Sequence, residues 1–424
     1  MTGKKSFLTD RSPVRDFVRE YMARRGIVVR FDHGLSIAGL VRQADKPEDV
    51  AEALTSVNPT LSQLEDLLVL RGRMAKYSSG AIKTALRLEV HAQRDARFAQ
   101  VVSAIMDEYQ QHDKGAAIRE WERLNALFEV EGLLAAIVLQ SFIWAVKQKA
   151  LDRKVTRHLM PIIFSPLQGT GKTMFVRKFV SPLQELAADG VLFSDMADRR
   201  SGDIFRYPVV ILDDMEQLSA SSVPIIKTVL TAESLRRRIL MTSMSSAIQQ
   251  QCMPIGTSNQ PIGELVPDST GNRRFVTLQF RNGDKIKGGD AAVWATVNDI
   301  DYLLLWQSVN PFGSNPVLPY LDEVRVHQGQ WVPPSPFRQW LIALDLTSEA
   351  LRSARTRGGY YADALREQFM LETGQEMTQR LFADQMALYI SRGDSPFGAK
   401  SRDRGGVFYI PKSAALPTLP HSPL

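Results

Sequence analysis

The chain of 424 residues has little cysteine and no long apolar run. A single thiol, that of Cys252, excludes a disulfide within the chain and a zinc site built from several thiolates of one subunit. No stretch of about 18 or more apolar residues occurs, and the N-terminal residues MTGKKSFLTDRSP lack the apolar centre of a signal peptide. We therefore expect a cytoplasmic protein without a membrane partner.

Glycine and proline are sparse in the first 150 residues, and that region shows neither a paired-carboxylate strand motif nor a set of zinc ligands. These absences argue against a polymerising or nuclease centre there. Apolar residues recur at helical spacing in Leu61–Leu70, Phe98–Tyr109 and Ile118–Lys147. The pattern predicts a helical N-terminal domain over residues 1–155, which would serve as an oligomerisation collar or in DNA binding.

The overall composition is that of an ordinary globular protein with a moderate excess of basic residues. Hydrophobic residues make up 44% of the chain and charged residues 23%, which is enough for two or three domains. Against 46 acidic residues stand 52 lysines and arginines, giving a formal net charge of +6. This excess favours polyanionic partners such as nucleic acid without proving them.

The most informative segment is SPLQGTGKT, residues 165–173, directly after the apolar run MPIIF. Glycines at 169 and 171 allow successive backbone N–H groups to turn around a phosphate, and the next residues begin a helix whose N-terminus favours negative charge. Lys172 would reach the β- and γ-phosphates, and Thr173 would hold Mg²⁺. Pro166 stands where the usual motif has glycine. The expected nucleotide-binding residues are Gln168, Gly169, Thr170, Gly171, Lys172 and Thr173.

A second buried strand, in YPVVILDDMEQL, ends in acidic residues. Mg²⁺ keeps most of its waters in such sites, so one carboxylate at the strand tip can help to hold it while a neighbouring acid polarises the attacking water. Asp213 suits the first role and Asp214 the second, with Glu216 as the other candidate for activating water. The sequence does not decide between Asp214 and Glu216.

Two further polar groups follow at strand boundaries. The run CMPIGTSN ends at Asn259, where an amide would orient a water beside the γ-phosphate. The segment DSTGNRRFVTLQF places Arg273 and Arg274 before another strand. An arginine supplied by a neighbouring subunit strongly stabilises the transition state of phosphoryl transfer, and either arginine could take this role.

Together, SPLQGTGKT, VVILDDME, GTSN and TGNRRF resemble the virulence-associated protein E family, which is similar to superfamily 3 helicases, AAA+ ring ATPases of phages, mobile elements and small viruses. The resemblance is firm over residues 156–280. It implies an α/β P-loop core over residues 156–310, with ATP and Mg²⁺ as cofactors. It also implies Lys172 and Thr173 as ligands, Asp213 and Asp214 as the acids that follow the second strand, Asn259 as the sensor, and an arginine finger at Arg273 or Arg274.

The same resemblance implies a DNA-gripping hairpin between the second strand and the sensor strand. That interval contains the basic triplet Arg236, Arg237 and Arg238, of the kind that contacts a phosphate backbone. Because successive strand residues face opposite ways, at most two of the three share a face, and one would instead serve a subunit interface.

Prolines become frequent after residue 310, with six from Pro311 to Pro336, and residues 311–335 are therefore interpreted as a connection between domains. Two helical patterns and a basic hairpin follow, which predicts a winged-helix-like domain over residues 336–424. In the hairpin, Lys400, Arg402 and Arg404 would contact DNA or would only be solvated.

The function favoured by these observations is an ATP-dependent DNA helicase of phage or mobile-element replication. It would act as a homo-oligomeric ring, expected to be a hexamer, that translocates on single-stranded or forked DNA and hydrolyses ATP at its subunit interfaces. Host or phage replication proteins would be further partners. The alternative is an origin-binding or helicase-loading ATPase that does not unwind DNA, since both would share every motif named above. A defence ATPase that senses nucleic acid is a third interpretation, which would need an effector activity that the sequence does not reveal.

Overall fold

A computed structural model describes residues 12–37, 59–106, 114–198, 202–215, 221–238, 245–266, 272–281, 289–331, 335–391, 393 and 395–412. The chain divides into two compact units, Met1–Trp331 and Val332–Leu424. The first unit contains a parallel sheet with helices, and the second contains a smaller antiparallel sheet.

The first described elements form a small helical layer with its own apolar core. Helix α1 (Pro13–Arg24) begins where the Ser12 hydroxyl accepts a hydrogen bond from the backbone N–H of Arg15, an ordinary N-cap. Val18, Leu64 and Leu86 are among the residues buried between the helices. The other elements of this layer are β1 (Ile27–Val29), β2 (Leu35–Ile37), α3 (Leu61–Met74) and α4 (Ser79–Met106).

The apolar repeat expected over Ile118–Lys147 belongs to two helices, α5 (Lys114–Asn125) and α6 (Leu134–Ala150). The chain turns between them at Gly132, whose φ of 57° is left-handed. Asn125 fixes the turn because its side chain donates to the carbonyl of Gly132 and accepts from the backbone N–H of Ala136. Both helices keep apolar residues on their buried sides, so spacing alone did not reveal the break.

Five parallel strands form the central sheet, in the order β4-β5-β8-β3-β9. Three central strands are buried along their whole length, which matches their reading as continuous apolar runs in the sequence. The crossover order places β3, the first of these five strands in the chain, between β8 and β9. The strands are β3 (Met160–Phe164), β4 (Ala187–Ala188), β5 (Val209–Leu212), β8 (Met253–Ser258) and β9 (Phe275–Gln279).

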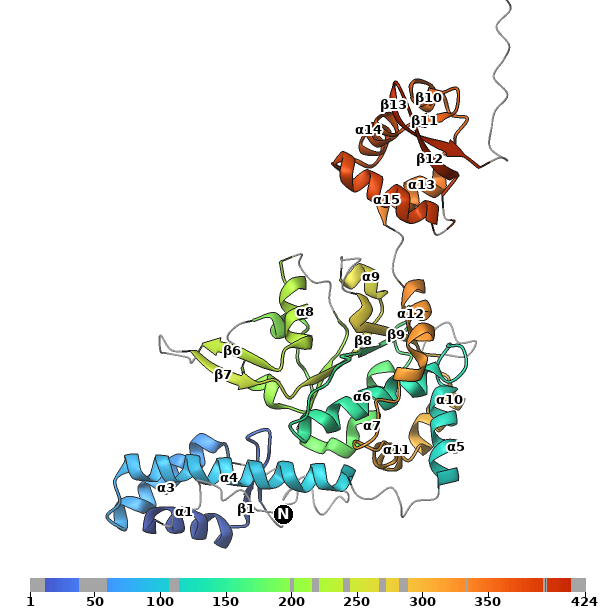
Figure 1. Ribbon diagram of the computed structural model, residues 1–424. Helices are drawn as coiled ribbons and strands as arrows, with labels where there is room; N and C mark the ends of the chain where they lie inside the picture. The colour runs from blue at the N-terminus through green and yellow to red at the C-terminus, as the bar shows by residue number, and fades with distance from the viewer. Residues whose placement is uncertain are drawn as a thin grey trace, which may run out of the picture. The chain divides into compact units, whose positions relative to one another are not determined.

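Helices cover both faces of this sheet (Figure 1). One face packs against α5, α6, α7 (Lys172–Val180), α10 (Ala291–Asp299) and α11 (Tyr302–Ser308). The other packs against α8 (Val223–Thr231) and α9 (Ile262–Leu265). The first of these cores joins residues such as Phe142 of α6 to Ile163 of β3. The boundary expected at residue 155 therefore does not separate two hydrophobic cores.

Helix α12 (Leu321–Gln330) lies along the outer edge of β9, inside the proline-rich segment 311–335. Its Gln328 side chain donates to the carbonyls of Arg273 and Phe275, and its His327 ring nitrogen lies 2.6 Å from the carbonyl of Thr277. These side chains bind backbone carbonyls that would otherwise be exposed on the outer strand of the sheet. Much of the expected connection is thus part of the first unit.

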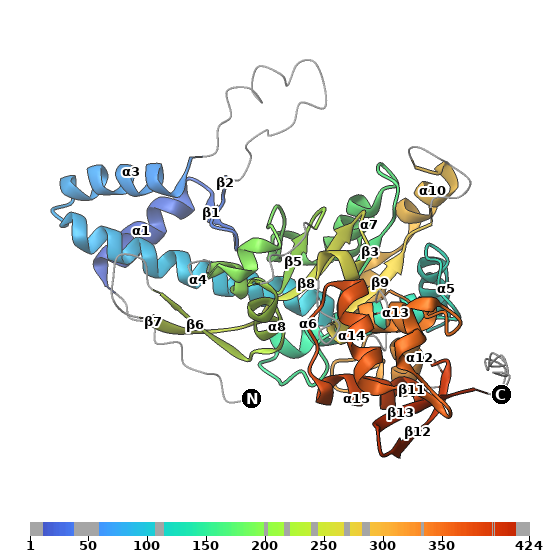
Figure 2. The same cartoon turned by 90° about the horizontal axis from the view of Figure 1, so that it is seen from above.

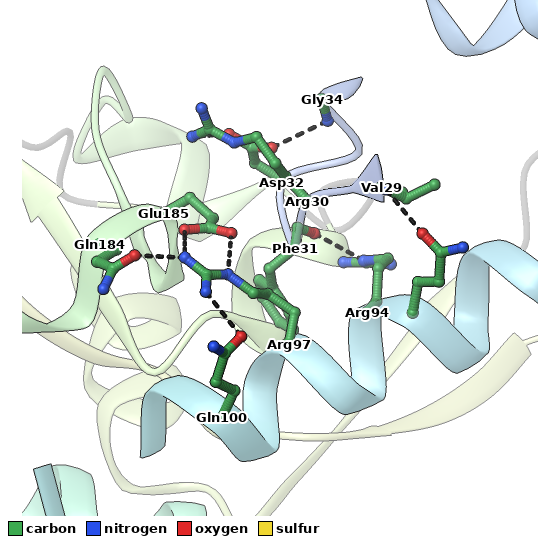
Figure 3. Close-up of polar contacts among 11 residues, drawn as sticks. Val29, Arg30, Phe31, Asp32, Gly34, Arg94, Arg97, Gln100, Gln184 and Glu185 are labelled. Carbon is green, nitrogen blue, oxygen red and sulfur yellow. Dashed lines mark hydrogen bonds and ion pairs between the residues drawn. The ribbon is translucent and has the colours of Figure 1, made fainter. Parts of the chain in front are cut away.

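Helix α4 is joined to the sheet region through the 3-10 turn η4 (Ser181–Leu186), which directly follows α7. Arg97 binds the Glu185 carboxylate with its Nε and Nη2, at 2.8 and 3.1 Å, and also contacts the Gln184 side chain (Figure 3). The backbone of Gln184 has a φ of 51° and ψ of −130°, which is unusual for a residue with a side chain. The N-terminal layer is therefore attached at the far end of the helix that starts at Lys172.

Strands β6 (Ser234–Arg238) and β7 (Ser245–Gln249) form an antiparallel hairpin between β5 and β8 in the chain. Figures 1 and 2 both show it extending away from the parallel sheet.

The second unit begins with α13 (Pro336–Ala343), whose Ser335 side chain caps it. Phe337, Trp340, Phe369 and Phe382 form an aromatic core between the helices. Its antiparallel sheet has the order β10-β11-β13-β12. The remaining elements are β10 (Arg355–Thr356), β11 (Gly359–Tyr361), α14 (Ala362–Thr373), α15 (Gln379–Ser391), β12 (Phe397–Asp403) and β13 (Gly406–Pro411).

Candidate functional site

Three neighbouring strands of the parallel sheet end at the same edge, and each is followed by residues singled out in the sequence. Strand β3 leads into the loop 165–171, β5 leads into Asp213 and Asp214, and β8 leads to Asn259. Because β5, β8 and β3 are adjacent and parallel, these segments converge. This is the position at which open parallel sheets of α/β proteins bind their ligands.

The loop before α7 needs left-handed backbone at two positions, Gly169 with φ 74° and Gly171 with φ 94°. Gly171 is also the N-cap of α7, and a Cβ there would lie 2.3 Å from Cζ2 of Trp294. Position 166 is not left-handed, and Pro166 is exposed. The glycine missing from the motif is therefore not required by this backbone.

The loop side chains differ in exposure. Gln168 is exposed, whereas Thr170 is buried and its hydroxyl has no hydrogen-bond partner among the described residues. The N-terminus of α7 follows directly, so backbone N–H groups and a helix dipole face this region. The arrangement is suited to an anion.

Lys172 is the first residue of α7 and is buried. Its Nζ donates to the carbonyls of Leu167 and Ser165, at 3.0 and 3.4 Å, and to Oδ1 of Asn259 at 2.5 Å. Burial lowers the pKa of Lys172, and the nearby carboxylates of Asp214 and Asp213 offset part of this effect. A cation held only by neutral acceptors gains most from an added anionic oxygen.

Thr173, Asp213 and Thr257 form a compact hydroxyl and carboxylate group. Oδ1 of Asp213 accepts from the hydroxyl of Thr173 at 2.6 Å and from that of Thr257 at 2.8 Å. Arg177, one turn along α7, places Nη2 3.7 Å from the other Asp213 oxygen. Hard oxygen ligands of this kind suit Mg²⁺. Sequence reasoning missed Thr257, although it lies in the GTSN motif two residues before Asn259.

Asp214 and Asn259 contact each other at the opening of the site. Nδ2 of Asn259 donates to Oδ1 of Asp214 at 2.8 Å, and the backbone N–H of Asp214 donates to the Thr257 hydroxyl. Asp214 is exposed and has a left-handed φ of 46°. Asn259 therefore links the carboxylate of Asp214 to the ammonium of Lys172. Glu216, the other candidate for activating water, lies outside the described residues.

Arg273 and Arg274 lie at the opposite end of the parallel strands, where the strands begin. They end the turn η7 (Asn272–Arg274) just before β9, and β9 runs parallel to β3 with Phe275 opposite Met160. Arg273 is exposed; Arg274 is half-buried, and burial together with Arg273 lowers its pKa. The structure does not bring these arginines to Lys172 of the same chain.

The basic triplet lies on β6, with Arg236 opposite Ala247 and Arg238 opposite Ser245 of β7. Leu235 is buried and Arg236 is exposed, in agreement with the expected alternation along a strand. For Arg237 and Arg238 only the backbone is described.

The predicted basic residues of the second unit lie on its hairpin β12–β13. Lys400 and Arg402 are exposed and, two residues apart on β12, share one face; Arg404 is exposed in the turn. Asp403 accepts hydrogen bonds from the Gly405 backbone N–H and the Tyr361 hydroxyl.

The described ranges hold neither a further metal site nor a membrane span. No cluster of three or more His, Cys, Asp or Glu side chains is positioned there to hold a metal ion. Every helix in these ranges is too short or too polar to cross a membrane.

Comparison with known proteins gives a family match over the middle of the chain. Residues 106–303 match the model of the virulence-associated protein E-like domain. No curated protein is similar enough to count as a match. The match covers all five strands of the parallel sheet and every residue of the converging site described above.

Similar solved structures include two apo structures of the NrS-1 C-terminal region. One has 12% sequence identity and a TM-score of 0.43, covering 73% of this chain and 77% of that chain. The other has 11% identity and a TM-score of 0.40, covering 73% and 78%. JCV helicase, in complex with a small acetamide compound, has 10% identity and a TM-score of 0.29, covering 76% and 93%. The family match and the parallel sheet agree: the chain has an α/β NTPase-like core, and its residues 106–303 are similar to the virulence-associated protein E-like domain.

Proposed function

We propose that the protein is an ATP-dependent DNA helicase of phage or mobile-element replication. The observation that carries the proposal is the convergence of Lys172, Thr173, Asp213, Asp214 and Asn259 at one edge of the sheet. Cation, hydroxyl, carboxylates and amide are the groups that phosphoryl transfer to water requires. The family match at residues 106–303 supports the same reading.

The chemistry of this edge fits ATP and Mg²⁺. Gln168, Gly169, Thr170 and Gly171 would surround the phosphates with backbone N–H groups, and Lys172 would exchange its carbonyl partners for phosphate oxygens. Thr173 and Asp213 would hold Mg²⁺, which neutralises charge on the phosphates when bound. Asp214, steadied by Asn259, would accept a proton from the attacking water, with Glu216 as the alternative base.

The arginines support hydrolysis shared between subunits. Five residues of β9, at about 3.3 Å each, separate the edge that carries Arg273 and Arg274 from the edge that carries Lys172. A head-to-tail ring, such as a hexamer, would bring one subunit's arginine edge to the next subunit's nucleotide edge. One of the two arginines would then stabilise the transition state in trans.

DNA contacts are assigned to the two basic hairpins. Arg236, Arg237 and Arg238 on β6 would contact the backbone of single-stranded DNA in the ring. In the second unit, the order helix α13, strands β10 and β11, helices α14 and α15, and hairpin β12–β13 resembles a winged-helix module. Lys400, Arg402 and Arg404 would be its backbone contacts to forked DNA.

Strand displacement on a forked DNA substrate tests the proposal. Wild-type protein should unwind the fork with ATP, and Lys172→Ala should abolish both hydrolysis and unwinding. Lys178→Ala, six residues along the same helix, is the matched control and should retain both activities. DNA-stimulated hydrolysis without unwinding would instead support an origin-binding or helicase-loading ATPase. The observation that favours this alternative is the winged-helix-like second unit, because such modules bind DNA. Absence of hydrolysis in the wild type would contradict both functions.

A further inference from the structure

A cavity of about 310 Å³ lies between helix α4 and strand β7. None of its lining residues belongs to the edge that carries Lys172. One wall comes from α4 and from Phe31, and the other from β7 and the turn η6 (Asp203–Arg206). The cavity therefore lies at the base of the basic hairpin.

A buried arginine forms part of the cavity wall. Arg94 is 5% exposed, its Nε donates to the carbonyl of Phe31 at 2.7 Å, and its guanidinium lies 4.8 Å from the centre of the Phe31 ring (Figure 3). Its Nη2 is buried and has no hydrogen-bond partner within the described ranges. A buried cationic donor without an acceptor is costly, and an anionic oxygen in the cavity would relieve that cost.

The rim of the cavity is predominantly basic. Arg206 and His91 are exposed at its edge, and Asp95 is its one acidic lining residue. Arg206 also lies 3.7 Å from Asp203, one helical turn away, in an exposed pair of the kind that contributes little. Two arginines and a histidine against one carboxylate favour an anionic ligand.

The same cavity offers flat apolar surface and amide groups. The rings of Phe31 and Phe98, with centres 5.9 Å apart, both line it. Gln249 and Gln251 line the opposite wall, although the amide of Gln249 already donates to Asp152, which is not part of the lining. Aromatic rings beside an arginine are the elements on which nucleic-acid bases stack, and amides can pair with base edges. The volume is at the small end of ligand cavities, which suits a single base with its sugar.

The cavity is lined by β7 residues that pair with the arginine strand of the hairpin. Arg236 lies directly opposite Ala247, and side chains of directly opposed strand residues share a face. Ala247 and Gln249, two residues apart on that face, line the cavity together with Ile248 of the other face. The backbone position of Arg238 has the same parity as Arg236. A strand that follows these arginines toward α4 would therefore reach Arg94 and Phe31.

We propose that this cavity holds one nucleotide of single-stranded DNA, with its phosphate at Arg94 and Arg206 and its base against Phe98. The inference rests on the DNA-binding role proposed above for the hairpin, and extends it to a contact at the hairpin's base. The N-terminal layer would thereby hold the strand that the hairpins move.

The test measures binding of a fluorescent oligothymidine to the full chain by anisotropy, over a series of salt concentrations. Arg206→Gln should weaken binding about threefold to tenfold and reduce the salt slope by about 0.7, the value for one lost phosphate contact to a single strand. Phe98→Leu should weaken binding by a similar factor with the slope unchanged, because it removes stacking and no charge. Arg325→Gln, which also breaks an exposed arginine–aspartate pair with a spacing of three residues, is the control and should match the wild type.

A photocrosslinking experiment identifies which residues contact the DNA base. Oligothymidine carrying 5-iododeoxyuridine should crosslink to residues of α4 around Phe98, and the adduct should disappear in Phe98→Leu. Melting temperatures equal to that of the wild type exclude unfolding as the cause. Strand binding that is unchanged in both variants would overturn the cavity proposal and leave the helicase proposal standing. If the two variants lost affinity for free thymidine monophosphate but bound the single strand as the wild type does, the cavity would be a mononucleotide site. That result would also overturn the cavity proposal. A wild type that binds no single strand would contradict both proposals.

Discussion

At the scale of single residues, Asp214 combines a chemical role with an unusual backbone. Its φ of 46° is a conformation that asparagine, aspartate and glycine tolerate better than other residues. Its side chain accepts from Asn259, and Asn259 in turn accepts from Lys172. The left-handed backbone at position 214 therefore favours a short polar side chain, and the proposed chemistry in addition requires a carboxylate.

We predict that Asp214→Asn separates these two requirements. Asparagine keeps the left-handed backbone and an oxygen that accepts from Asn259, so the melting temperature should stay close to that of the wild type. Without a base, hydrolysis should fall about 100-fold or more while nucleotide affinity is retained. Asp214→Ala is the conformational control and should lower the free energy of unfolding by about 1 kcal/mol. If Asp214→Asn hydrolyses ATP at the wild-type rate, Glu216 becomes the candidate base.

Pro166 supports a second prediction at this scale, since the phosphate loop has proline where the usual motif has glycine. The backbone at 166 is not left-handed, so a glycine there would not relieve strain in the folded chain. It would only raise the conformational entropy of the unfolded chain. Pro166→Gly should lower the free energy of unfolding by about 0.4–1 kcal/mol and leave ATP hydrolysis unchanged. Gly171→Ala should abolish hydrolysis, because its Cβ would meet Trp294. Denaturant unfolding and an ATPase assay measure both; faster hydrolysis by the Pro166→Gly variant would show that proline restrains the loop.

At the scale of elements, α6 carries a buried lysine against the end of α11. Nζ of Lys147 donates to the carbonyls of Trp306 and Val309 at 2.7 and 2.8 Å, at the C-terminal end of α11. Burial lowers the pKa of Lys147 from its ordinary 10.5 to about 7. The lysine joins two helices that cover the same face of the sheet, at the cost of holding a titratable group away from water.

This lysine should make stability depend on pH in a definite direction. Between pH 7 and 10.5 the unfolded chain binds a proton that the folded chain lacks, so the free energy of unfolding should rise with pH in that window. The slope would be at most about 1.4 kcal/mol per pH unit. Lys147→Met should flatten the rise between pH 7 and 9, measured by urea unfolding. Lys149, with a pKa lowered to about 8, contributes separately and remains in the variant. An unchanged slope would mean that Lys147 stays protonated in the fold.

The elements that the sequence could predict are those whose burial is uniform. Strands β3 and β5 read as apolar runs because they are buried on both faces, and their polar C-terminal neighbours mark the site. Strand β4 has only two alanines and no pattern to detect. The break between α5 and α6 was hidden because both helices bury apolar residues, and Lys147 was hidden because burial of a lysine depends on carbonyls more than 150 residues away. Thr257 and Trp294 act through contacts that only the fold creates.

At the scale of the whole molecule, the two ends of the parallel strands in the first unit carry chemically different residues. The residues proposed to bind nucleotide follow the C-terminal ends of β3, β5 and β8, whereas Arg273 and Arg274 precede the N-terminal end of β9. Because the strands are parallel, the sheet itself keeps the two arginines away from the end that carries Lys172 of the same chain. If Arg273 or Arg274 takes part in hydrolysis as proposed, it would therefore act on the nucleotide of another copy of the chain.

Mixing two inactive variants tests this geometry. Lys172→Ala lacks the phosphate-binding lysine, and a double Arg273→Ala, Arg274→Ala variant lacks both candidate arginines, so each alone should hydrolyse no ATP. In a mixed ring, an interface is intact when the arginine variant binds the nucleotide and the lysine variant supplies the arginine. With equal amounts and random exchange, about a quarter of interfaces meet that condition, and hydrolysis should recover toward that fraction of the wild-type rate. Single arginine variants mixed in the same way identify which one acts. If the mixture stays inactive although subunits exchange, as energy transfer between labelled copies would report, the two edges do not meet, and the arginines serve the fold or the DNA instead.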